Sequence, residues 1–399
     1  MRIYGFAIFI SLVMAVSGLI QIILLKYLNR VWWRNRYLKL ISLLLPALGI
    51  ASIILWVAGY QIHSLWLSSV GSGLAMFSFI MILALIISLP FSGIINGIDG
   101  YLARRSGKKR TKAKAERMSC ERRSFLKYAA AAFPAVTITT GGGGIAQSFR
   151  GTKVYLLPLY FKNLPSELNG LRILHLTDAH LGIYKYLEDL EETLASAEPY
   201  KPDLVLFTGD ICDELSLLPE ALNLAASLKT PAGSFAVLGN HEYYRGIDQV
   251  LAAFDKSRVV LLRNSGVNIN SKGKSFYLAG ADDPVIMRAD ISAFMKQTVE
   301  KSLEKAPSDS FKILMTHRPE GFDAAAANGV DLTLAGHTHG GQVGVGHRSF
   351  WEGLVPNRYL WGKYEKDGSQ MYLSSGIGHW FPFRVGCPPE APVLELRSA

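Results

Sequence analysis

One charge-free stretch constrains this chain more than any other feature. From Leu40 to Ile98 the sequence contains no Asp, Glu, Lys or Arg. Because a soluble domain rarely continues so long without charge, the expected surrounding is lipid. About 20 apolar residues, at 1.5 Å per residue, cross a hydrocarbon core of about 30 Å. Pro90 and Gly93 are expected to break the last apolar helix. The predicted membrane spans are Ile3–Leu25, Leu40–Gly59 and Trp66–Leu89.

A fourth uncharged stretch, Tyr128–Phe149, is rich in Ala, Thr and Gly and is the weakest candidate for a span. The segment Arg122-Arg123-Ser124-Phe125-Leu126-Lys127 precedes it and resembles a bacterial twin-arginine export signal. Such signals usually begin a protein, and a basic flank on an ordinary membrane helix explains the same residues. A twin-arginine signal and an ordinary membrane helix would both place residues 150–399 on the outer face of the membrane.

The net charge is divided unevenly along the chain. Residues 1–127 hold 17 Lys and Arg against 3 Asp and Glu, whereas the remainder holds 25 against 29. The positive-inside rule predicts that the basic loops 26–39 and 99–127 face the cytoplasm. The N-terminus and the uncharged loop 60–65 then lie outside, and a fourth crossing places residues 150–399 outside too. Because the second half carries no net positive charge, nucleic acid is not an expected partner.

These patterns predict a membrane domain with three transmembrane helices (1–99), a basic cytoplasmic linker (100–127), a fourth transmembrane or twin-arginine-like segment (128–149) and a globular domain (150–399). In the globular domain, short apolar runs alternate with segments of helical spacing such as Tyr186–Ala197 and Leu215–Leu228, which predicts a layered α/β fold. In such sheets, sites form where loops leave the carboxyl ends of the strands. The predicted strands are Leu171–Thr177, Leu204–Phe207, Ser234–Leu238, Phe276–Ala279, Lys312–Met315, Leu332–Leu334, Met371–Ser374 and Val393–Leu396.

Five polar motifs follow strands of this domain. They are Asp178-Ala179-His180, Gly209-Asp210, Gly239-Asn240-His241-Glu242, His317 and Gly336-His337-Thr338-His339. They offer oxygen and imidazole donors and no thiolate, since the three cysteines lie outside them and show no metal-ligand spacing. This donor set suits Mn²⁺, Fe or Zn²⁺ and disfavours a Cys-rich structural zinc site. The glycines permit tight turns and close backbone approach beside an ion.

The order D-x-H, G-D, G-N-H-[DE], H, G-H-x-H is complete, and over residues 153–397 the chain resembles a calcineurin-like metallophosphoesterase. The nearest branch is the bacterial membrane-associated phosphohydrolases, which share features such as Gly376-Ile377-Gly378 and Arg384 before Pro388-Pro389-Glu390. The resemblance implies an α-β-β-α sandwich preceded here by transmembrane helices. It also implies two divalent metal ions, of Mn, Fe or Zn, as cofactors.

The resemblance assigns a role to each motif residue. It implies a first metal held by Asp178, His180, Asp210 and His339, and a second held by Asp210, Asn240, His317 and His337, with Asp210 bridging the two. His241 is implied to be catalytic and to bind no metal, and Glu242 either orients His241 or caps a helix. Arg318 and Arg384 are weaker candidates for binding substrate phosphate, since a surface ion pair explains each of them more simply.

The expected chemistry is hydrolysis of a phosphate ester or pyrophosphate. Two cations lower the pKa of a shared water, the resulting hydroxide attacks phosphorus, and His241 protonates the leaving oxygen. Anchoring in a lipid bilayer favours a lipid or envelope-precursor substrate over a small phosphorylated molecule. The related branch includes enzymes for nucleotide-linked lipid sugars such as UDP-diacylglucosamine, although a cytoplasmic site would suit that substrate better. The alternatives are a catalytically silent membrane sensor or scaffold, which the intact ligand set disfavours, and a general nucleotidase or protein phosphatase.

Overall fold

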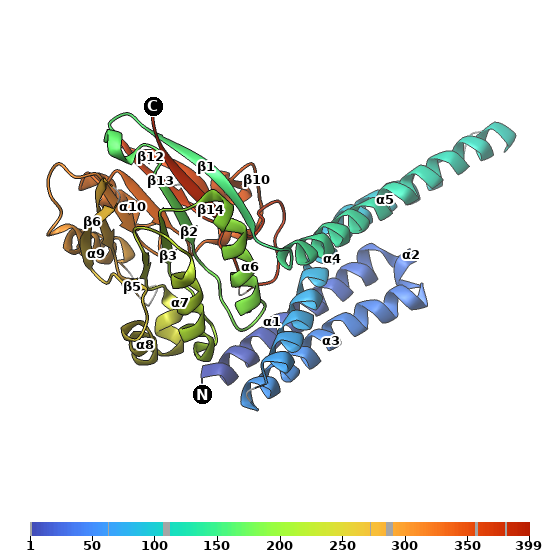
Figure 1. The fold of residues 1–399 in the computed structure, drawn as a ribbon. Coiled ribbons are helices and arrows are strands. Elements are labelled where there is room, and N and C mark those ends of the chain that lie inside the picture. Colours follow the sequence, from blue (N-terminus) through green and yellow to red (C-terminus); the bar gives the residue numbers. More distant parts are fainter. Residues whose placement is uncertain are drawn as a thin grey trace. The chain divides into compact units, whose positions relative to one another are not determined.

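The computed structural model describes residues 2–62, 64–106, 112–271, 273–284, 290–355, 358–379 and 381–399. The chain forms two compact units, Met1–Ala146 and Gln147–Ala399, here called the membrane unit and the catalytic unit (Figure 1). The predicted basic run Lys108-Lys109-Arg110 lies outside the described residues, as do the side chains of Arg122 and Arg123.

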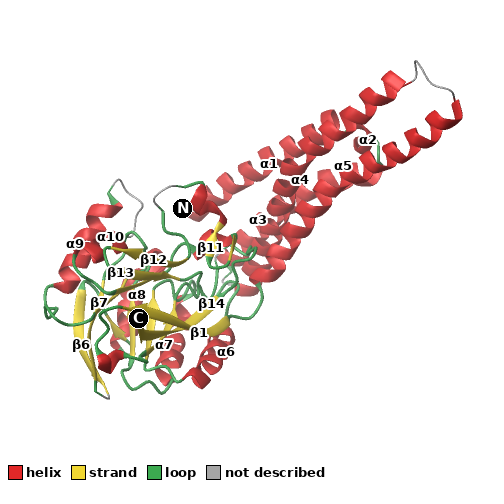
Figure 2. Ribbon diagram, turned by 90° about the horizontal axis from the view of Figure 1, so that it is seen from above, coloured by secondary structure: helices red, strands yellow, loops and turns green. Residues whose placement is uncertain are grey.

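Helices make up the membrane unit (Figure 2). They are α1 (Arg2–Leu28), α2 (Arg30–Trp33), α3 (Arg36–Gln61), α4 (Leu65–Ser106) and α5 (Lys112–Ser148). Among the described residues, three segments are long and apolar enough to cross a membrane: Ala7–Leu28, Arg36–Gln61 and Leu65–Ile98. The three predicted spans are therefore present as apolar helices. The stretch 128–149 lies mostly in α5, which is not among the three, so a fourth crossing stays a prediction.

Glycines and polar side chains bring these helices together. A Cβ built on Gly71 of α4 would lie 2.4 Å from the Trp56 backbone nitrogen of α3, so only glycine permits this approach. The prediction that Pro90 ends the helix was wrong, because α4 continues through it to Ser106. Proline removes one backbone hydrogen bond, and hydroxyl groups and adjacent helices support the local backbone. The same compensation is seen in α5, where the Ser92 hydroxyl of α4 donates at 2.7 Å to the carbonyl of Ala130, which Pro134 leaves without its helical N–H donor.

Two six-stranded sheets form the centre of the catalytic unit. The first has the order β1 (Lys153–Phe161), β14 (Glu390–Ser398), β2 (Arg172–Leu176), β3 (Leu204–Thr208), β4 (Ser234–Val237) and β5 (Val260–Leu261). The second has the order β12 (Gly362–Lys366), β13 (Ser369–Leu373), β9 (Leu332–Ala335), β8 (Lys312–Met315), β7 (Lys274–Gly280) and β6 (Ser265–Ser271). Strands β2 to β5 are parallel to one another, as are β7, β8, β9 and β13. The carboxyl ends of adjacent strands therefore meet at one edge of each sheet.

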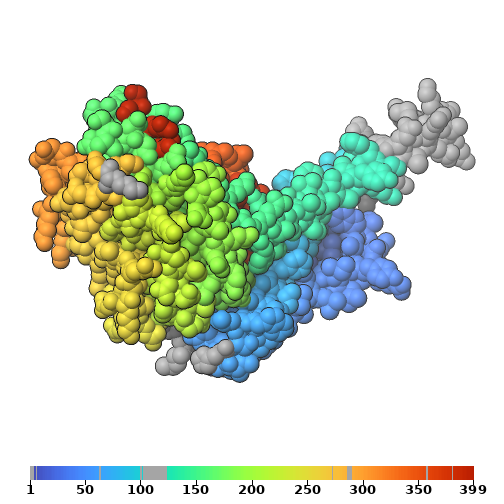
Figure 3. Space-filling model, in the orientation of Figure 1, coloured from blue at the N-terminus to red at the C-terminus, as the bar shows by residue number. Residues whose placement is uncertain are grey.

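Helices cover the outer face of each sheet. Helices α6 (Leu187–Ala197), α7 (Leu218–Ser227) and α8 (Asn240–Asp255) pack on the first sheet, while α9 (Ile291–Leu303) and α10 (Gly321–Ala327) pack on the second. Between the sheets, side chains such as Leu206 and Ile313 share one buried apolar core. Figure 3 shows residues of α6 and α7, in yellow-green, covering the face turned to the viewer. This order of layers confirms the α-β-β-α sandwich.

The predicted strands all correspond to strands, with ends displaced by a few residues. The four strands at the sheet edges, β1, β5, β6 and β12, were not predicted, nor were β10 (Gly344–Val345), β11 (Arg348–Ser349), α8, α9 and α10. Strand β1 pairs in parallel with β14, so that Lys153 lies opposite Glu390. That pairing joins the two ends of the catalytic unit, and no local sequence pattern could indicate it.

Candidate metal centre and catalytic site

The five motifs meet where the two sheets present their carboxyl ends. Asp178, Asp210 and Asn240 follow β2, β3 and β4 of the first sheet, whereas His317 and His337 follow β8 and β9 of the second. One hydrogen bond joins the sheets directly at this place: His317 Nδ1 lies 2.8 Å from the carbonyl oxygen of Thr208 at the end of β3. Because a carbonyl only accepts, Nδ1 carries the proton and Nε2 is left to face the site.

Besides a group formed by His180, Asp213 and His241, the described residues contain two clusters of potential ligand atoms that consist of predicted metal ligands. The first contains Asp178, His180 and His339, and the second contains Asp210, His317 and His337; within each, the ligand atoms lie within 4.8 Å of one another. Asp210 Oδ2 is 3.2 Å from His317 Nε2 and 3.6 Å from His180 Nε2. This carboxylate therefore lies between the clusters, where a shared ligand would have to be.

Unpaired atoms show that these residues fit divalent cations. His180 Nε2 and Asn240 Oδ1 are buried and have no hydrogen-bond partner in the described structure. Since the other ring nitrogen of His180 pairs with Asp213 Oδ2 at 3.2 Å, the lone pair of Nε2 is directed toward the carboxylates of Asp178 and Asp210. Leaving buried polar atoms unpaired is costly, and a cation bound by these donors would satisfy them.

The backbone is strained at most of these positions. Asp178, His180, Asp210, His337 and His339 all have φ between 46° and 73°, the left-handed region that residues with a Cβ seldom adopt. The strain turns the chain sharply at each strand end, so that two ligands of one motif reach the same site. Gly336 allows β9 to pass close by, because a Cβ there would lie 2.1 Å from Asp178 Oδ2.

Negative charge dominates the electrostatics of the site. Burial alone would lower the pKa of His180, but Asp213, Asp210 and Asp178 outweigh it and raise that pKa to about 9. Burial also opposes protonation of His317, yet Asp210 and Asp178 raise its pKa to about 10. The carboxylates thus attract positive charge to the centre of the site, which is the property a divalent cation requires.

Comparison with known proteins identifies the family of this chain. The sequence model of the calcineurin-like phosphoesterases matches residues 171–341. An uncharacterized metallophosphoesterase of Aquifex aeolicus is 31% identical over 238 residues, which cover 57% of this chain and 85% of that protein. The chain belongs to the calcineurin-like phosphoesterase family.

Two further relatives extend this likeness. The uncharacterized metallophosphoesterase YkuE of Bacillus subtilis is 28% identical over 290 residues, covering 69% of this chain and 98% of that protein. The transmembrane protein with metallophosphoesterase domain of Bos taurus is 28% identical over 278 residues, covering 66% of this chain and 61% of that protein. The chain is thus a metal-dependent phosphoesterase, and its three apolar helices indicate that it associates with a membrane.

In this phosphoesterase His241 lies beside both clusters. Its backbone N–H donates to Asp210 Oδ1 at 2.9 Å, and its ring lies 4.5 Å from that of His180 between centroids. His241 Nδ1 is 2.6 Å from Asp213 Oδ1, and the side chain keeps 16% of its surface exposed. The structure thus pairs His241 with a buried carboxylate and leaves one side of the ring open to solvent.

Asp213 is the functional residue that the sequence analysis missed. It contacts His180, His241 and also Arg245, whose Nη2 lies 2.9 Å from Asp213 Oδ1. Burial would raise the pKa of Asp213, but its hydrogen bonds and charge interactions with His180 and His241 hold that pKa well below its usual range. The signal available in the sequence was a second aspartate three residues after Asp210.

Glu242 does not contact His241 by a described hydrogen bond. Its carboxylate accepts the backbone N–H groups of Gly239, Asp210 and Ile211 at 2.7–2.9 Å. It therefore caps α8, which begins at Asn240, and ties the loop after β3 to the loop after β4. Of the two roles expected for Glu242, the structure shows the cap.

Neither arginine considered for substrate phosphate lies on the surface. Arg318 is 2% exposed, and its guanidinium contacts Asp283 Oδ2 and His337 Nε2, both at 2.8 Å. Arg384 is fully buried and donates to backbone carbonyls, including those of Ser375 and Gly378. In this geometry Arg318 supports His337, and Arg384 holds the loop between β13 and β14. The surface ion pair expected as the simpler explanation was wrong for Arg384, and Arg318 forms an ion pair with Asp283 that is buried instead of lying at the surface.

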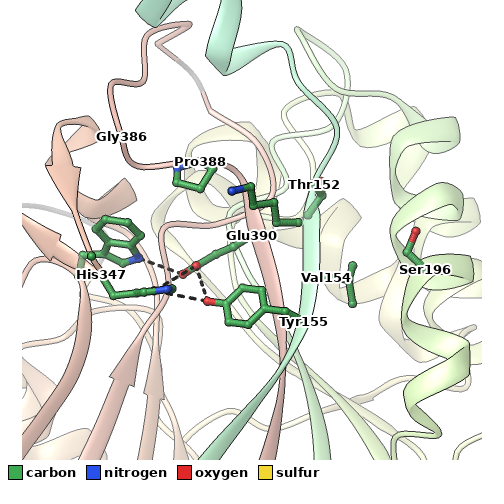
Figure 4. Close-up of a pocket in the computed structure, with 11 residues that line it drawn as sticks. Thr152, Val154, Tyr155, Ser196, His347, Gly386, Pro388 and Glu390 are labelled. Carbon is green, nitrogen blue, oxygen red and sulfur yellow. Dashed lines mark hydrogen bonds and ion pairs between the residues drawn. The ribbon is translucent and has the colours of Figure 1, made fainter.

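A separate cavity of about 660 Å³ contains none of the motif residues. Figure 4 shows Tyr155 and His347 directed toward Glu390 inside it. Glu390 is 1% exposed and accepts hydrogen bonds from Tyr155, at 2.7 Å, and from the Trp361 indole, at 3.0 Å. Because both oxygens of this buried carboxylate are paired, we interpret Glu390, Tyr155 and Trp361 as a structural cluster that stabilises the packing of β14 against its neighbours.

Proposed function

We propose that this phosphoesterase hydrolyses phosphate ester or pyrophosphate bonds at a centre of two divalent cations, Mn, Fe or Zn. One observation carries the proposal: side chains from four strand ends of two sheets converge on two adjacent clusters, with Asp210 between them. A catalytically silent scaffold would not need to keep the full set of donors, most of them on strained backbone and most of them buried.

In this proposal the first cation is held by Asp178, His180, Asp210 and His339, and the second by Asp210, Asn240, His317 and His337. When bound, two such cations supply a water of lowered pKa and neutralise charge on the phosphoryl oxygens. The protein contributes the strained loops that fix the donors before substrate arrives. Asp213 fixes the imidazole of His180 from behind, as carboxylates do for histidine ligands in general.

His241 is the proposed catalytic residue. Its Nδ1 pairs with the Asp213 carboxylate, so this nitrogen holds a proton and Nε2 remains as the ring atom available to the substrate. The exposed side of the ring is where a departing oxygen would receive its proton. Arg245 restrains Asp213 in turn, since it donates from both Nε and Nη2.

Activity of the purified full-length chain tests this function. The protein is extracted in detergent, treated with chelator and reloaded with Mn²⁺, Fe²⁺ or Zn²⁺. We expect two metal ions per chain and metal-dependent hydrolysis of at least one among bis-p-nitrophenyl phosphate, p-nitrophenyl phosphate and a pyrophosphate-linked lipid. If the chain binds two metal ions but hydrolyses none of the three substrates, it acts as a sensor or scaffold, and the proposal is refuted.

The proposed setting is the cell membrane, with several spans and the catalytic unit on the outer face. The apolar helices and the basic loops support it, and confinement at a bilayer favours lipid or envelope-precursor substrates such as UDP-diacylglucosamine-like glycolipids. Paired reporter fusions after Arg150, one active outside and one active in the cytoplasm, test the orientation. Activity of the cytoplasmic reporter alone would overturn it and would favour nucleotide-linked substrates.

A further inference from the structure

Large apolar side chains gather on the surface directly after the G-H-x-H motif. Val345, Phe350, Trp351, Leu354 and Val355 are each between 38% and 81% exposed. In the rest of the catalytic unit, as far as it is described, only Phe149, Tyr160, Tyr244 and Val260 are large, apolar and similarly exposed, and they are scattered. We call residues 343–355 the apolar hairpin.

The exposure of this hairpin is a property of a well-formed structure. Strands β10 (Gly344–Val345) and β11 (Arg348–Ser349) pair antiparallel and lead into a 3-10 helix, η5 (Phe350–Gly353). The Phe350 N–H donates to the Val343 carbonyl at 2.8 Å, and the Ser349 hydroxyl caps η5 at the N–H of Trp351. These bonds order the hairpin while most of the surface of Val345, Phe350 and Leu354 stays exposed, so folding of the unit gains little from these three side chains.

The hairpin is also attached to the metal-site loop. The Trp351 indole N–H donates to the carbonyl of Gly341 at 2.9 Å, and Gly341 is two residues beyond His339. Gly341 itself donates to the carbonyl of Thr338 at 2.8 Å, within the motif. A surface that fixes the hairpin therefore also fixes the loop that carries His337 and His339.

The composition of this surface indicates its partner. Phenylalanine, tryptophan and aliphatic side chains, flanked by Arg348 and Arg358, are typical of segments that lie in the interface of a bilayer. Arg348 is partly neutralised by Glu352 at 3.6 Å, whereas the side chain of Arg358 is exposed. The arginines suit anionic lipid phosphates. The same chain carries three apolar helices, so the catalytic unit is confined close to a bilayer by a covalent link. Exposed apolar patches of this kind usually mark an interaction site.

We propose that the apolar hairpin inserts into the membrane interface and holds the metal site against the bilayer, so that the site takes a phosphate ester carried on a lipid. This inference rests on the proposed function and names its substrate class. Docking on a second copy or on the chain's own helices would cover the same side chains, and the experiment separates these outcomes.

Spin labelling of the full-length chain in nanodiscs of phosphatidylglycerol and phosphatidylethanolamine gives the direct test. The label is placed by Leu354→Cys, and the matched control is Val260→Cys on β5, an exposed apolar position outside the hairpin. Cys120→Ser is included in both, whereas Cys212 and Cys387 are buried. We expect the ratio of accessibility to oxygen over a water-soluble nickel complex to be about tenfold higher at 354 than at 260. Equal ratios would place the hairpin in water, and low access to both reagents would indicate a protein contact; either result overturns the proposal.

Kinetics provide a second, independent test. The variant Phe350→Ser with Leu354→Ser is compared with Tyr160→Ser with Val260→Ser. We expect the hairpin variant to lose about tenfold in kcat/KM on a lipid phosphodiester in nanodiscs and to retain its rate on bis-p-nitrophenyl phosphate. Equal loss on both substrates would indicate a structural role, and no loss on the lipid would remove the membrane role. If the wild-type chain hydrolyses neither substrate, it is the proposed function that fails.

Discussion

The metal-site loops and the apolar hairpin, which directly follows the loop that carries His337 and His339, depart from the usual distribution of side chains in opposite directions. The loops bury Asp178 and Asp210, at 0% and 2% exposure, whereas the hairpin exposes Val345 and Phe350, at 81% and 64%. In most folded proteins, carboxylates are rarely buried so completely, and large apolar side chains are rarely grouped at such high exposure. In the loops, part of the cost of burial is offset by hydrogen bonds, such as those from the Thr177 hydroxyl and the His337 N–H to Asp178.

Both the buried carboxylates of the loops and the exposed apolar side chains of the hairpin thus indicate that something further binds at these places. Buried carboxylates with unpaired donors around them require a cation, because burying charge is costly unless it is compensated. Exposed apolar side chains on a well-bonded hairpin favour an interaction site there, because folding of the unit leaves most of their surface in water. The predictions below remove one of these features at a time.

The largest effect is expected for Asp210→Ala. This change removes the carboxylate between the two clusters, so we expect metal content to fall and hydrolysis to be lost on every substrate. Replacing a residue behind a ligand already costs about 10–100-fold in metal affinity or activity, and a shared ligand should cost more. Metal analysis and kinetics check the result, with Asp248→Ala, an exposed carboxylate of α8, as the control. Full metal content in Asp210→Ala would contradict the shared-ligand assignment.

His241→Ala should separate catalysis from metal binding. We expect this variant to keep its metals and to lose about 10²–10⁴-fold in rate on esters with poor leaving groups. The loss should be smaller on nitrophenyl esters, whose leaving oxygen needs little protonation. Rates on an alkyl and a nitrophenyl phosphodiester, measured with metal content, give the comparison. Loss of metal equal to that of Asp210→Ala would make His241 a ligand or a structural residue.

Asp213→Asn should have an intermediate effect, of about 10–100-fold on metal affinity or activity. Asp213 contacts His180 and His241 through different oxygens, at 3.2 Å and 2.6 Å, so one amide group cannot accept from both rings. We therefore expect both metal affinity and the dependence on leaving group to change. Asp248→Asn is the matched control. A change in thermal stability alone, with kinetics and metal affinity intact, would limit Asp213 to a role in folding.

The candidate ligands could be predicted from the sequence because each of them belongs to a short motif that directly follows an apolar strand. The partners of those residues were not visible. Whether Asp213 or Glu242 would meet His241 depends on how the loops after β3 and β4 cross, and the strained backbone at Asp178 and His339 follows from tertiary packing. Burial of Arg384 among backbone carbonyls likewise depends on a long loop that has no periodic pattern.

In the fold, too, the elements that depend on neighbouring residues could be predicted, whereas those that depend on residues far away in the chain could not. Strands buried on both faces, such as β3, read as continuous apolar runs and were predicted from the sequence. Strand β1 lies at a sheet edge, and its partner β14 is more than 200 residues away, so its pairing could not be read from its own residues. The apolar hairpin was missed because short strands and a 3-10 helix carry little periodicity.

The smallest effect is expected for the stability of hairpin variants, and this small effect is informative. Leu354 is 64% exposed, so Leu354→Ser should change the free energy of unfolding by no more than about 0.5 kcal/mol, as surface substitutions usually do. Leu334 on β9 is fully buried between the sheets, and Leu334→Ala should cost about 2–5 kcal/mol. Thermal unfolding of both variants in detergent checks the difference. A large loss in Leu354→Ser would mean that the side chain stabilises the unit itself. A negligible loss would leave contact outside the unit as the remaining reason for an apolar side chain at this position.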